Sequence, residues 1–241
     1  MKNQKFLIPI FLFLLAMSSC NDDDGVFQNC ESGDGPIVEQ VLNISEFSGV
    51  EIKTSTNVFI TQGPVFEVVA KGEQNIIDLL DTDVRNDVWE IDFNDCVKNF
   101  SLEIFITMPE IDYLEISGLG EIWGDNFFEV DDITLRISGS GDMCLGLFAQ
   151  NIDARISGSG EMDLEGETDN LDFKVTGSGD LDGFPLIAKE ADINITGSGD
   201  VSVTTLEFLK VRISGSGDVF YKGFPELNVD ITGSGDLVDA N

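Results

Sequence analysis

Carboxylates recur at one position of a short repeated motif. The motif consists of Ile or Val, then Ser or Thr, then Gly-Ser-Gly, and then an acid, and its six acids are Asp142, Glu161, Asp180, Asp200, Asp218 and Asp236. Carboxylates in such a series could bind Ca²⁺, which takes roughly 6–8 oxygen ligands. They could also work in pairs, because glycoside hydrolysis uses two carboxyl groups roughly 5–10 Å apart. The commoner role is structural, in which each carboxylate closes a turn by accepting hydrogen bonds from the amides of the glycine bend.

The composition excludes several other kinds of chemistry. The chain has 241 residues and no histidine, so a Ser-His-Asp relay and a zinc site with a histidine ligand are both ruled out. The serines of the motif have no base beside them that could activate a nucleophile. The 45 Asp and Glu outnumber the 13 Lys and Arg, and we therefore expect no binding to nucleic acid. We therefore expect a protein that is not an enzyme. Because 42% of its residues are hydrophobic, the chain can form a buried core.

The spacing of the motif defines a structural repeat. A degenerate seventh copy contains Ser117, and successive copies lie 18–21 residues apart, with their Ser or Thr at positions 117, 138, 157, 176, 196, 214 and 232. On both sides of each motif, apolar and polar residues alternate, which is typical of half-buried strands. Each period therefore contains short strands joined by bends, and Gly-Ser-Gly is one bend because glycine tolerates close backbone approach.

A parallel β-solenoid explains this repeat better than an antiparallel meander. A meander would need a dozen or more strands in one twisted sheet, which is rare. In a solenoid, equivalent positions stack at about 4.8 Å, so the same residue type is expected at the same place in each period. We predict an all-β, right-handed parallel β-helix with about 18–21 residues per rung, the handedness following from the usual crossover rule.

Residues 37–116 are less regular than the repeats that follow. Strands are expected at residues 50–52, 57–60, 66–69, 88–91 and 102–106, and a short helix at 73–80 is expected to cap the coil. Because no Pro- or Gly-rich linker separates the two parts, we predict one domain over residues 37–241. Its irregular rungs and cap lie at 37–116 and its regular repeats at 117–241.

The N-terminus is typical of an exported lipoprotein. Residues 1–19 combine a basic start with an apolar run too short to span a bilayer as a helix. They end at Cys20 in a sequence that resembles a lipobox, and the alternative is an ordinary cleaved signal peptide. We expect Cys20 to be lipidated and residues 20–36 to form an acidic tether. The protein would then sit in the bacterial outer membrane, exposed to the exterior or to the periplasm.

Three cysteines lie beyond Cys20, and an odd number permits at most one internal disulfide. The cell envelope allows disulfides to form. We favour a bridge between Cys30 and Cys96, which would fasten the start of the domain to a later strand. Cys144 lies inside a repeat and would then carry a free thiol.

Other side chains could bind partners. The two tryptophans, Trp89 and Trp123, would stack on sugar rings if they were exposed, although core packing is commoner for this residue type. In the Phe127-Phe128 pair, one ring must face inward in any strand. One column of the repeat carries basic residues that could neutralise the neighbouring acids: Arg136, Arg155, Lys174 and Arg212.

The serial copies of the motif, and the strand that ends at Met108-Pro109, resemble the DUF2807 family, also called putative auto-transporter adhesin, head GIN domain. The resemblance extends over residues 40–236. It implies a pectin-lyase-like β-helix, a location in the bacterial envelope and a role in adhesion.

These observations favour a non-catalytic binding or structural module of the cell envelope. Its expected partners are the membrane, through the lipid anchor, and an extracellular glycan or protein; a homodimer could form through the ends of the coil. One alternative is an enzyme that acts on polysaccharides through acids that break the repeat symmetry, such as Asp125 or Asp182. Another is a spacer stabilised by calcium on the acidic column.

Overall fold

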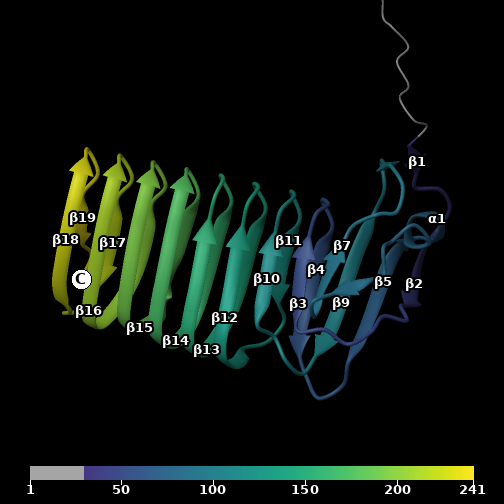
Figure 1. Ribbon diagram of the computed structural model, residues 1–241, viewed down its shortest axis with the longest axis horizontal. Coiled ribbons are helices and arrows are strands. Elements are labelled where there is room, and N and C mark those ends of the chain that lie inside the picture. The colour runs from purple at the N-terminus through teal and green to yellow at the C-terminus, as the bar shows by residue number, and fades with distance from the viewer. Residues whose placement is uncertain (1–29) are drawn as a thin grey trace, which may run out of the picture.

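The computed structural model describes residues 30–241, which fold into a flattened coil of parallel strands (Figure 1). It is a β-solenoid of about seven turns, as the repeat predicts. In Figure 1 the chain climbs the near wall, turns over at the top and advances from right to left, so the coil is right-handed. The predicted signal peptide, Cys20 and most of the tether lie outside the described residues. Among residues 30–241, no helix is long and apolar enough to cross a bilayer.

The regular part of the coil consists of strands that bend once and continue. The first half of each long strand lies on the far wall in Figure 1, and the second half lies on the near wall. The bent strands are β12 (Phe128–Ile137), β13 (Asp142–Ile156), β14 (Glu161–Gly177), β15 (Asp180–Gly197) and β16 (Val201–Gly215). The rungs at either end of this part contain shorter strands that each lie on one wall: β10 (Tyr113–Ile116), β11 (Glu121–Gly124), β17 (Val219–Lys222), β18 (Glu226–Gly233) and β19 (Leu237–Asp239).

Neighbouring rungs pair in parallel and in register. Ile137 lies opposite Ile156, which lies opposite Val175, and the same alignment continues to the last motif. Alternate residues point inward and form apolar columns; Met143, Met162 and Leu181 form one of them on the far wall, and each is at most 2% exposed. Removal of these columns from water stabilises the coil by roughly 25 cal/mol per Å² of apolar surface.

The Gly-Ser-Gly bends lie directly on top of one another. A Cβ atom on Gly158 would lie 2.0 Å from the carbonyl oxygen of Gly139 in the preceding bend. The backbone of Gly197 adopts a φ of 143° in addition to a similar close approach to Gly177. Glycine is therefore required here by the neighbouring rung as much as by the bend itself.

The first three rungs are not stacked in the order of the sequence. On the near wall, β3 (Gly49–Ile52) lies between β7 (Val88–Ile91) and β10. On the far wall, β4 (Asn57–Gln62) lies between β9 (Leu102–Met108) and β11. The chain therefore forms the second rung first, with β3 and β4. It forms the end rung afterwards, with β7 and β9, and then continues the coil on the other side of β3 and β4.

Antiparallel strands and a short helix cover the N-terminal end of the coil (Figure 1). There β5 (Glu67–Glu73) pairs with β9 and with β2 (Ile37–Val41), and β6 (Val84–Arg85) pairs with β7. The helix predicted over residues 73–80 is only one turn, α1 (Gln74–Ile77), whose Ile76 and Ile77 are buried. Cys30 and Cys96 form a disulfide that holds β1 (Glu31–Ser32) beside β8 (Val97–Lys98), and Cys144 is a free thiol.

Candidate functional site

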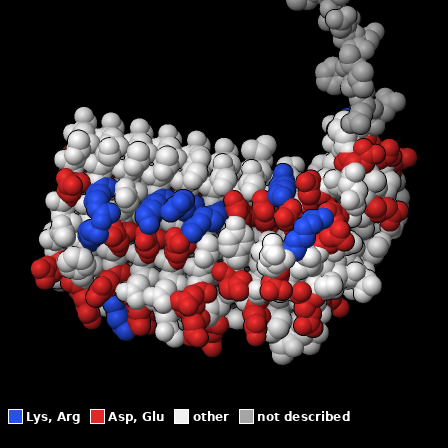
Figure 2. Space-filling view, viewed as in Figure 1, with Lys and Arg blue, Asp and Glu red and all other residues white. Residues whose placement is uncertain are grey.

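The exposed side chains of the near wall form three parallel columns because residues two apart in a strand share a face. The hydroxyl column runs nearest the Gly-Ser-Gly bends, the cation column runs beside it, and the aspartate column follows. The cation column appears in Figure 2 as a blue band below the crest of the bends. The members of the three columns are Ser138, Ser157, Thr176, Thr196 and Ser214; Arg136, Arg155, Lys174 and Arg212; and Asp153, Asp172 and Asp192.

The predicted acidic ladder lies elsewhere, where the chain leaves the bends for the far wall. The amide of Asp200 donates to Oδ1 of Asp180 at 2.6 Å, and the amide of Asp218 donates to Oδ1 of Asp200 at 2.8 Å. Asp236 and Glu161 each donate in the same way to the acid one rung before them. The donor is therefore the amide of the next acid, and not an amide of the glycine bend as we had expected. The bond ties successive rungs together.

The ladder shows no geometry of a metal centre. Among residues 30–241, no group of three or more Cys, Asp or Glu side chains is arranged to hold a metal ion. Burial, and then the charges of Asp163, Asp142 and neighbouring acids, raises the pKa of Glu161 above its ordinary value. The stacked carboxylates therefore repel one another, and the hydrogen bonds that backbone amides donate along the ladder offset this repulsion.

The cation column neutralises the aspartate column, and not the acidic ladder as the sequence had suggested. Arg136 donates to both carboxylate oxygens of Asp153, at 3.1 and 2.8 Å. Its guanidinium holds the pKa of Asp153 below the ordinary value. Lys174 bonds to Asp172 at 3.0 Å. The two columns are neighbours on the same wall, whereas the ladder begins on the far side of the bend.

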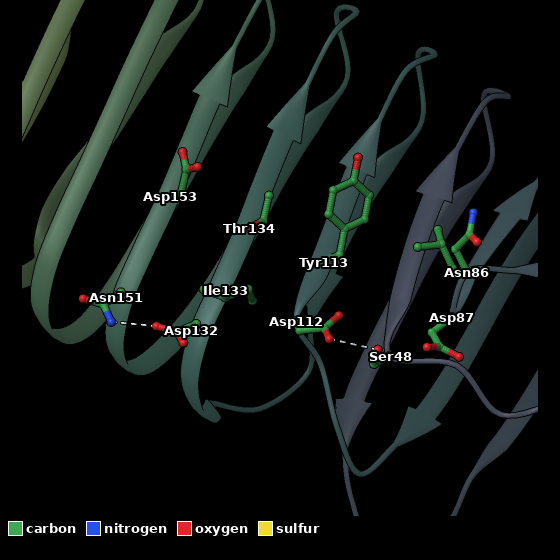
Figure 3. Close-up of a pocket in the computed structure, with 11 residues that line it drawn as sticks. Ser48, Asn86, Asp87, Asp112, Tyr113, Asp132, Ile133, Thr134, Asn151 and Asp153 are labelled. Carbon is green, nitrogen blue, oxygen red and sulfur yellow. Dashed lines mark hydrogen bonds between the residues drawn. The ribbon is translucent and has the colours of Figure 1, made fainter.

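A hollow of about 540 Å³ opens at the N-terminal end of the near wall, beside the aspartate column (Figure 3). Asn86 and Asp87 border it from the tight turn between β6 and β7, where both residues adopt positive φ angles of 54° and 62°. The other polar residues that line it come from the start of three rungs and from the segment before β3: Ser48, Asp112, Tyr113, Asp132, Thr134, Asn151 and Asp153.

Hydrogen bonds orient the side chains of this hollow. Ser48 donates to Asp112 at 3.0 Å, and Asn151 donates to Asp132 at 2.6 Å (Figure 3). The hydroxyl of Tyr113 donates to Glu115, and burial together with this bond raises the pKa of Tyr113 well above its ordinary value. The tyrosine therefore remains neutral at physiological pH and presents its ring to the hollow.

The chemistry of the hollow suits a ligand rich in hydroxyl groups. Carboxylates such as Asp112 and Asp132 accept hydrogen bonds from hydroxyls, Asn86 can both donate and accept, and the Tyr113 ring offers an apolar surface. These residues do not recur with the repeated motif, so the repeat does not mark them as a site. The signal that could have revealed them is a break in a column, since Tyr113 stands where the following rungs carry Thr134 and Asp153.

The candidate aromatic residues are divided between core and surface. Trp89 is fully buried and donates to the carbonyl of Asp81 at 2.9 Å, whereas Trp123 is 41% exposed. Phe128 faces inward and Phe127 faces outward, where it stacks on Phe148 with ring centroids 5.0 Å apart. The expectation that one ring of this pair is buried is confirmed.

The acids that break the repeat symmetry do not converge on one site. Asp125 accepts a hydrogen bond from Thr61 at 3.2 Å. Asp182 accepts one from Ser202 at 2.9 Å and lies one rung from Asp163, in a separate hollow of about 260 Å³. Burial and the charge of Asp182 raise the pKa of Asp163. Adjacent rungs place acids side by side without any catalytic requirement, so this pair alone does not indicate an enzyme.

The fold and the polar near wall define the class of protein: a right-handed parallel β-solenoid that displays columns of side chains and a polar hollow. Its family follows from the sequence. The chain belongs to the DUF2807 family, described as putative auto-transporter adhesin, head GIN domain, whose model matches residues 46–225. No curated protein matches the sequence.

Solved structures share the fold at low sequence identity. A putative adhesin from Bacteroides fragilis NCTC 9343 superimposes with a TM-score of 0.80 at 22% identity, over 86% of this chain and 98% of that chain. A putative lipid binding protein from Parabacteroides distasonis ATCC 8503 superimposes with a TM-score of 0.72 at 23% identity, over 87% of this chain and 99% of that chain. A putative adhesin from Parabacteroides merdae ATCC 43184 superimposes with a TM-score of 0.71 at 18% identity, over 87% of this chain and 99% of that chain.

Proposed function

We propose that this protein is a non-catalytic binding module of the bacterial cell envelope that attaches the cell to extracellular glycans or proteins. The observation that carries the proposal is the hollow on the near wall, where carboxylates, amides and the ring of Tyr113 converge. The description of the family, and of the structurally similar protein from Bacteroides fragilis, as putative adhesins supports a role in adhesion.

We further infer that Cys20 carries the lipid anchor in the outer membrane, with the coil on the cell surface. Residues 1–20 support this inference through their resemblance to a lipoprotein signal. The disulfide between Cys30 and Cys96 is consistent with an oxidising compartment outside the cytoplasm. Because the ladder carboxylates accept hydrogen bonds from backbone amides of the next rung, we assign them a structural role in place of calcium binding.

Glycan binding tests this function directly. We would purify the full-length protein in detergent and screen it against arrays of glycans and matrix proteins. Asp132→Ala should weaken binding by about tenfold or more, because each hydrogen bond between a charged group and its partner contributes about 1.5–3 kcal/mol. Asp131→Ala is the matched control, since Asp131 bonds to Gln150 at 2.6 Å as Asp132 bonds to Asn151, but it does not line the hollow.

The outcome separates the alternatives. Equal binding by the two variants would show that the hollow is not part of the binding site. Failure of the wild-type protein to bind any glycan or matrix protein at micromolar concentration would contradict the proposed function. Release of sugar fragments from an acidic polysaccharide would replace it with an enzymatic function.

We also propose that a second copy of the chain covers the C-terminal end of the coil. Within residues 30–241, β18 pairs on one side only, with β16. Leu227, Val229 and Ile231 continue columns that are buried in earlier rungs, yet each of the three is 37–43% exposed. Equivalent edges of two copies could pair about a twofold axis and cover these side chains.

A further inference from the structure

Three consecutive rungs of this strongly acidic protein place cations directly above one another. Arg136 lies in register with Arg155, and Arg155 lies in register with Lys174. Paired strands are about 4.8 Å apart, so the three positive charges repel one another. The chain has only 13 basic residues against 45 acidic ones, so three stacked cations are unexpected. The question is which groups neutralise each of them.

The outer two cations have partners and the middle one does not. Asp153 turns both of its oxygens toward Arg136, and Asp172 accepts a hydrogen bond from Lys174. In the part of the chain that the structure describes, no carboxylate lies within ion-pair distance of Arg155. Its guanidinium retains donors that fit a planar oxyanion in a bidentate geometry.

A hollow of about 220 Å³ lies between the cation column and the hydroxyl column at this point. Its polar lining consists of Arg155, Lys174, Ser157, Thr176, Asn194 and Thr196, all of which can donate hydrogen bonds. No acid lines it, whereas the hollow beside Tyr113 and the hollow beside Asp182 both contain carboxylates. The lining is rich in hydrogen-bond donors even apart from Arg155, and the Arg155 guanidinium has no carboxylate partner, so both features indicate an anionic group.

We propose that this hollow binds an oxyanion, the carboxylate or sulfate group of an acidic glycan, between Arg155 and Lys174. The inference rests on the proposed glycan-binding function and names the class of glycan. The net charge of −32 repels densely charged polyanions, although salt screens this repulsion beyond roughly 8 Å at physiological ionic strength. A chain whose acid groups are separated by neutral hydroxyls meets less repulsion, and its neutral sugars could reach the hollow beside Tyr113 on the same wall.

The first experiment uses small anions, so that it does not depend on any glycan. The full-length protein in detergent is titrated with sulfate and, separately, with galacturonate, while the side-chain Nε–H signals of its arginines are followed by NMR. Arg155→Gln identifies the relevant signal. We expect both anions to shift the Arg155 signal in a saturable manner and to leave the Arg136 signal unchanged. A signal that does not respond to either anion overturns the inference, even if glycans bind elsewhere.

The second experiment compares carboxylated, sulfated and neutral oligosaccharides of equal length. Arg155→Gln should weaken binding of the acidic ligands by about tenfold and leave neutral ligands unaffected, and Arg155→Lys should retain part of the affinity. The control is Lys189→Gln, which removes the same charge from a lysine paired with Asp169 away from this hollow. Equal loss in both variants, or preference for vesicles of anionic lipid over acidic oligosaccharides, overturns the inference. Sulfate binding at Arg155 without binding of any glycan would instead contradict the proposed function and leave an anion site.

Discussion

At the scale of single residues, the same side chain has different roles in different columns. The carboxylate of Asp180 accepts the amide of the next rung, and the carboxylate of Asp153 binds the guanidinium of Arg136. Asp163 has neither kind of partner and lies in register with Asp182 and with the free thiol of Cys144. Burial and nearby acids raise the pKa of both Asp163 and Cys144, so a carboxylate at position 163 destabilises the fold.

Asp163→Asn should therefore stabilise the protein at neutral pH. Because the folded state raises the pKa of Asp163, the cost of its charge is complete above the raised value, shrinks as the pH falls below that value, and is gone below the ordinary pKa. We expect the melting temperature to rise by about 1–2 °C at pH 7, a small effect because the group is largely exposed. The gain should vanish in acid, as calorimetry across pH would show.

Asp153→Asn provides the opposite control. Arg136 lowers the pKa of Asp153, so its stabilising contribution is present above the ordinary pKa and is lost as the pH falls through the lowered value. This variant should melt below the wild type at pH 7 and approach it in acid. Shifts of the same sign in the two variants would contradict our assignment of the columns.

At the scale of the element, the stacked bend is the most constrained part of the coil. Its glycines approach the preceding rung so closely that a single methyl group has no room, as at Gly158 and Gly160. The serine between them is exposed and is free of this constraint. The repeat is thus maintained by contacts between successive bends as well as by the apolar columns beneath them.

Gly158→Ala should destabilise the protein markedly. The new Cβ would lie 2.0 Å from the Gly139 oxygen, and relief of such a contact costs about 1–3 kcal/mol, which corresponds to a melting temperature lower by about 2–12 °C. Ser159→Ala in the same bend should change the melting temperature by less than about 2 °C. Thermal unfolding followed by circular dichroism compares the two, and equal effects would contradict the close stacking of the bends.

At the scale of the whole molecule, the two ends of the coil differ. Strands β2 and β5 and the helix α1 cover the N-terminal end, where the disulfide holds the first described residues in place. At the other end, the apolar residues of β18 remain partly exposed. An exposed parallel edge of this kind favours association between chains.

Val229→Lys should therefore shift the protein toward the monomer. A charge on the exposed edge would be buried without a partner in the paired state, which we expect to weaken association by at least about tenfold. Light scattering after size-exclusion chromatography in detergent measures the mass over a range of concentrations. Leu206→Lys, on the side of the coil at 51% exposure, is the control. A wild-type protein that stays monomeric at every concentration would contradict the proposed dimer.

Much of the architecture could be predicted because the motif recurs at nearly constant intervals. The alternation around Ile156 and Val175 predicts which side chains face inward, and the recurrence of glycine predicts parallel stacking in register; the structure confirms both. Both properties follow from features that successive periods share, so comparison of one period with the next is sufficient to predict them.

The candidate site could not be predicted in this way because it depends on pairing between distant segments. Tyr113 lies opposite Gly49, which lies opposite Val88, so three segments that are far apart in the chain meet at one hollow. No local pattern shows that β3 lies between β7 and β10. Likewise, the choice of Asp153 as the partner of Arg136 depends on which neighbouring rung each side chain reaches. Repetition of short-range preferences is sufficient for a coil, whereas binding surfaces arise where folding brings unrelated segments together.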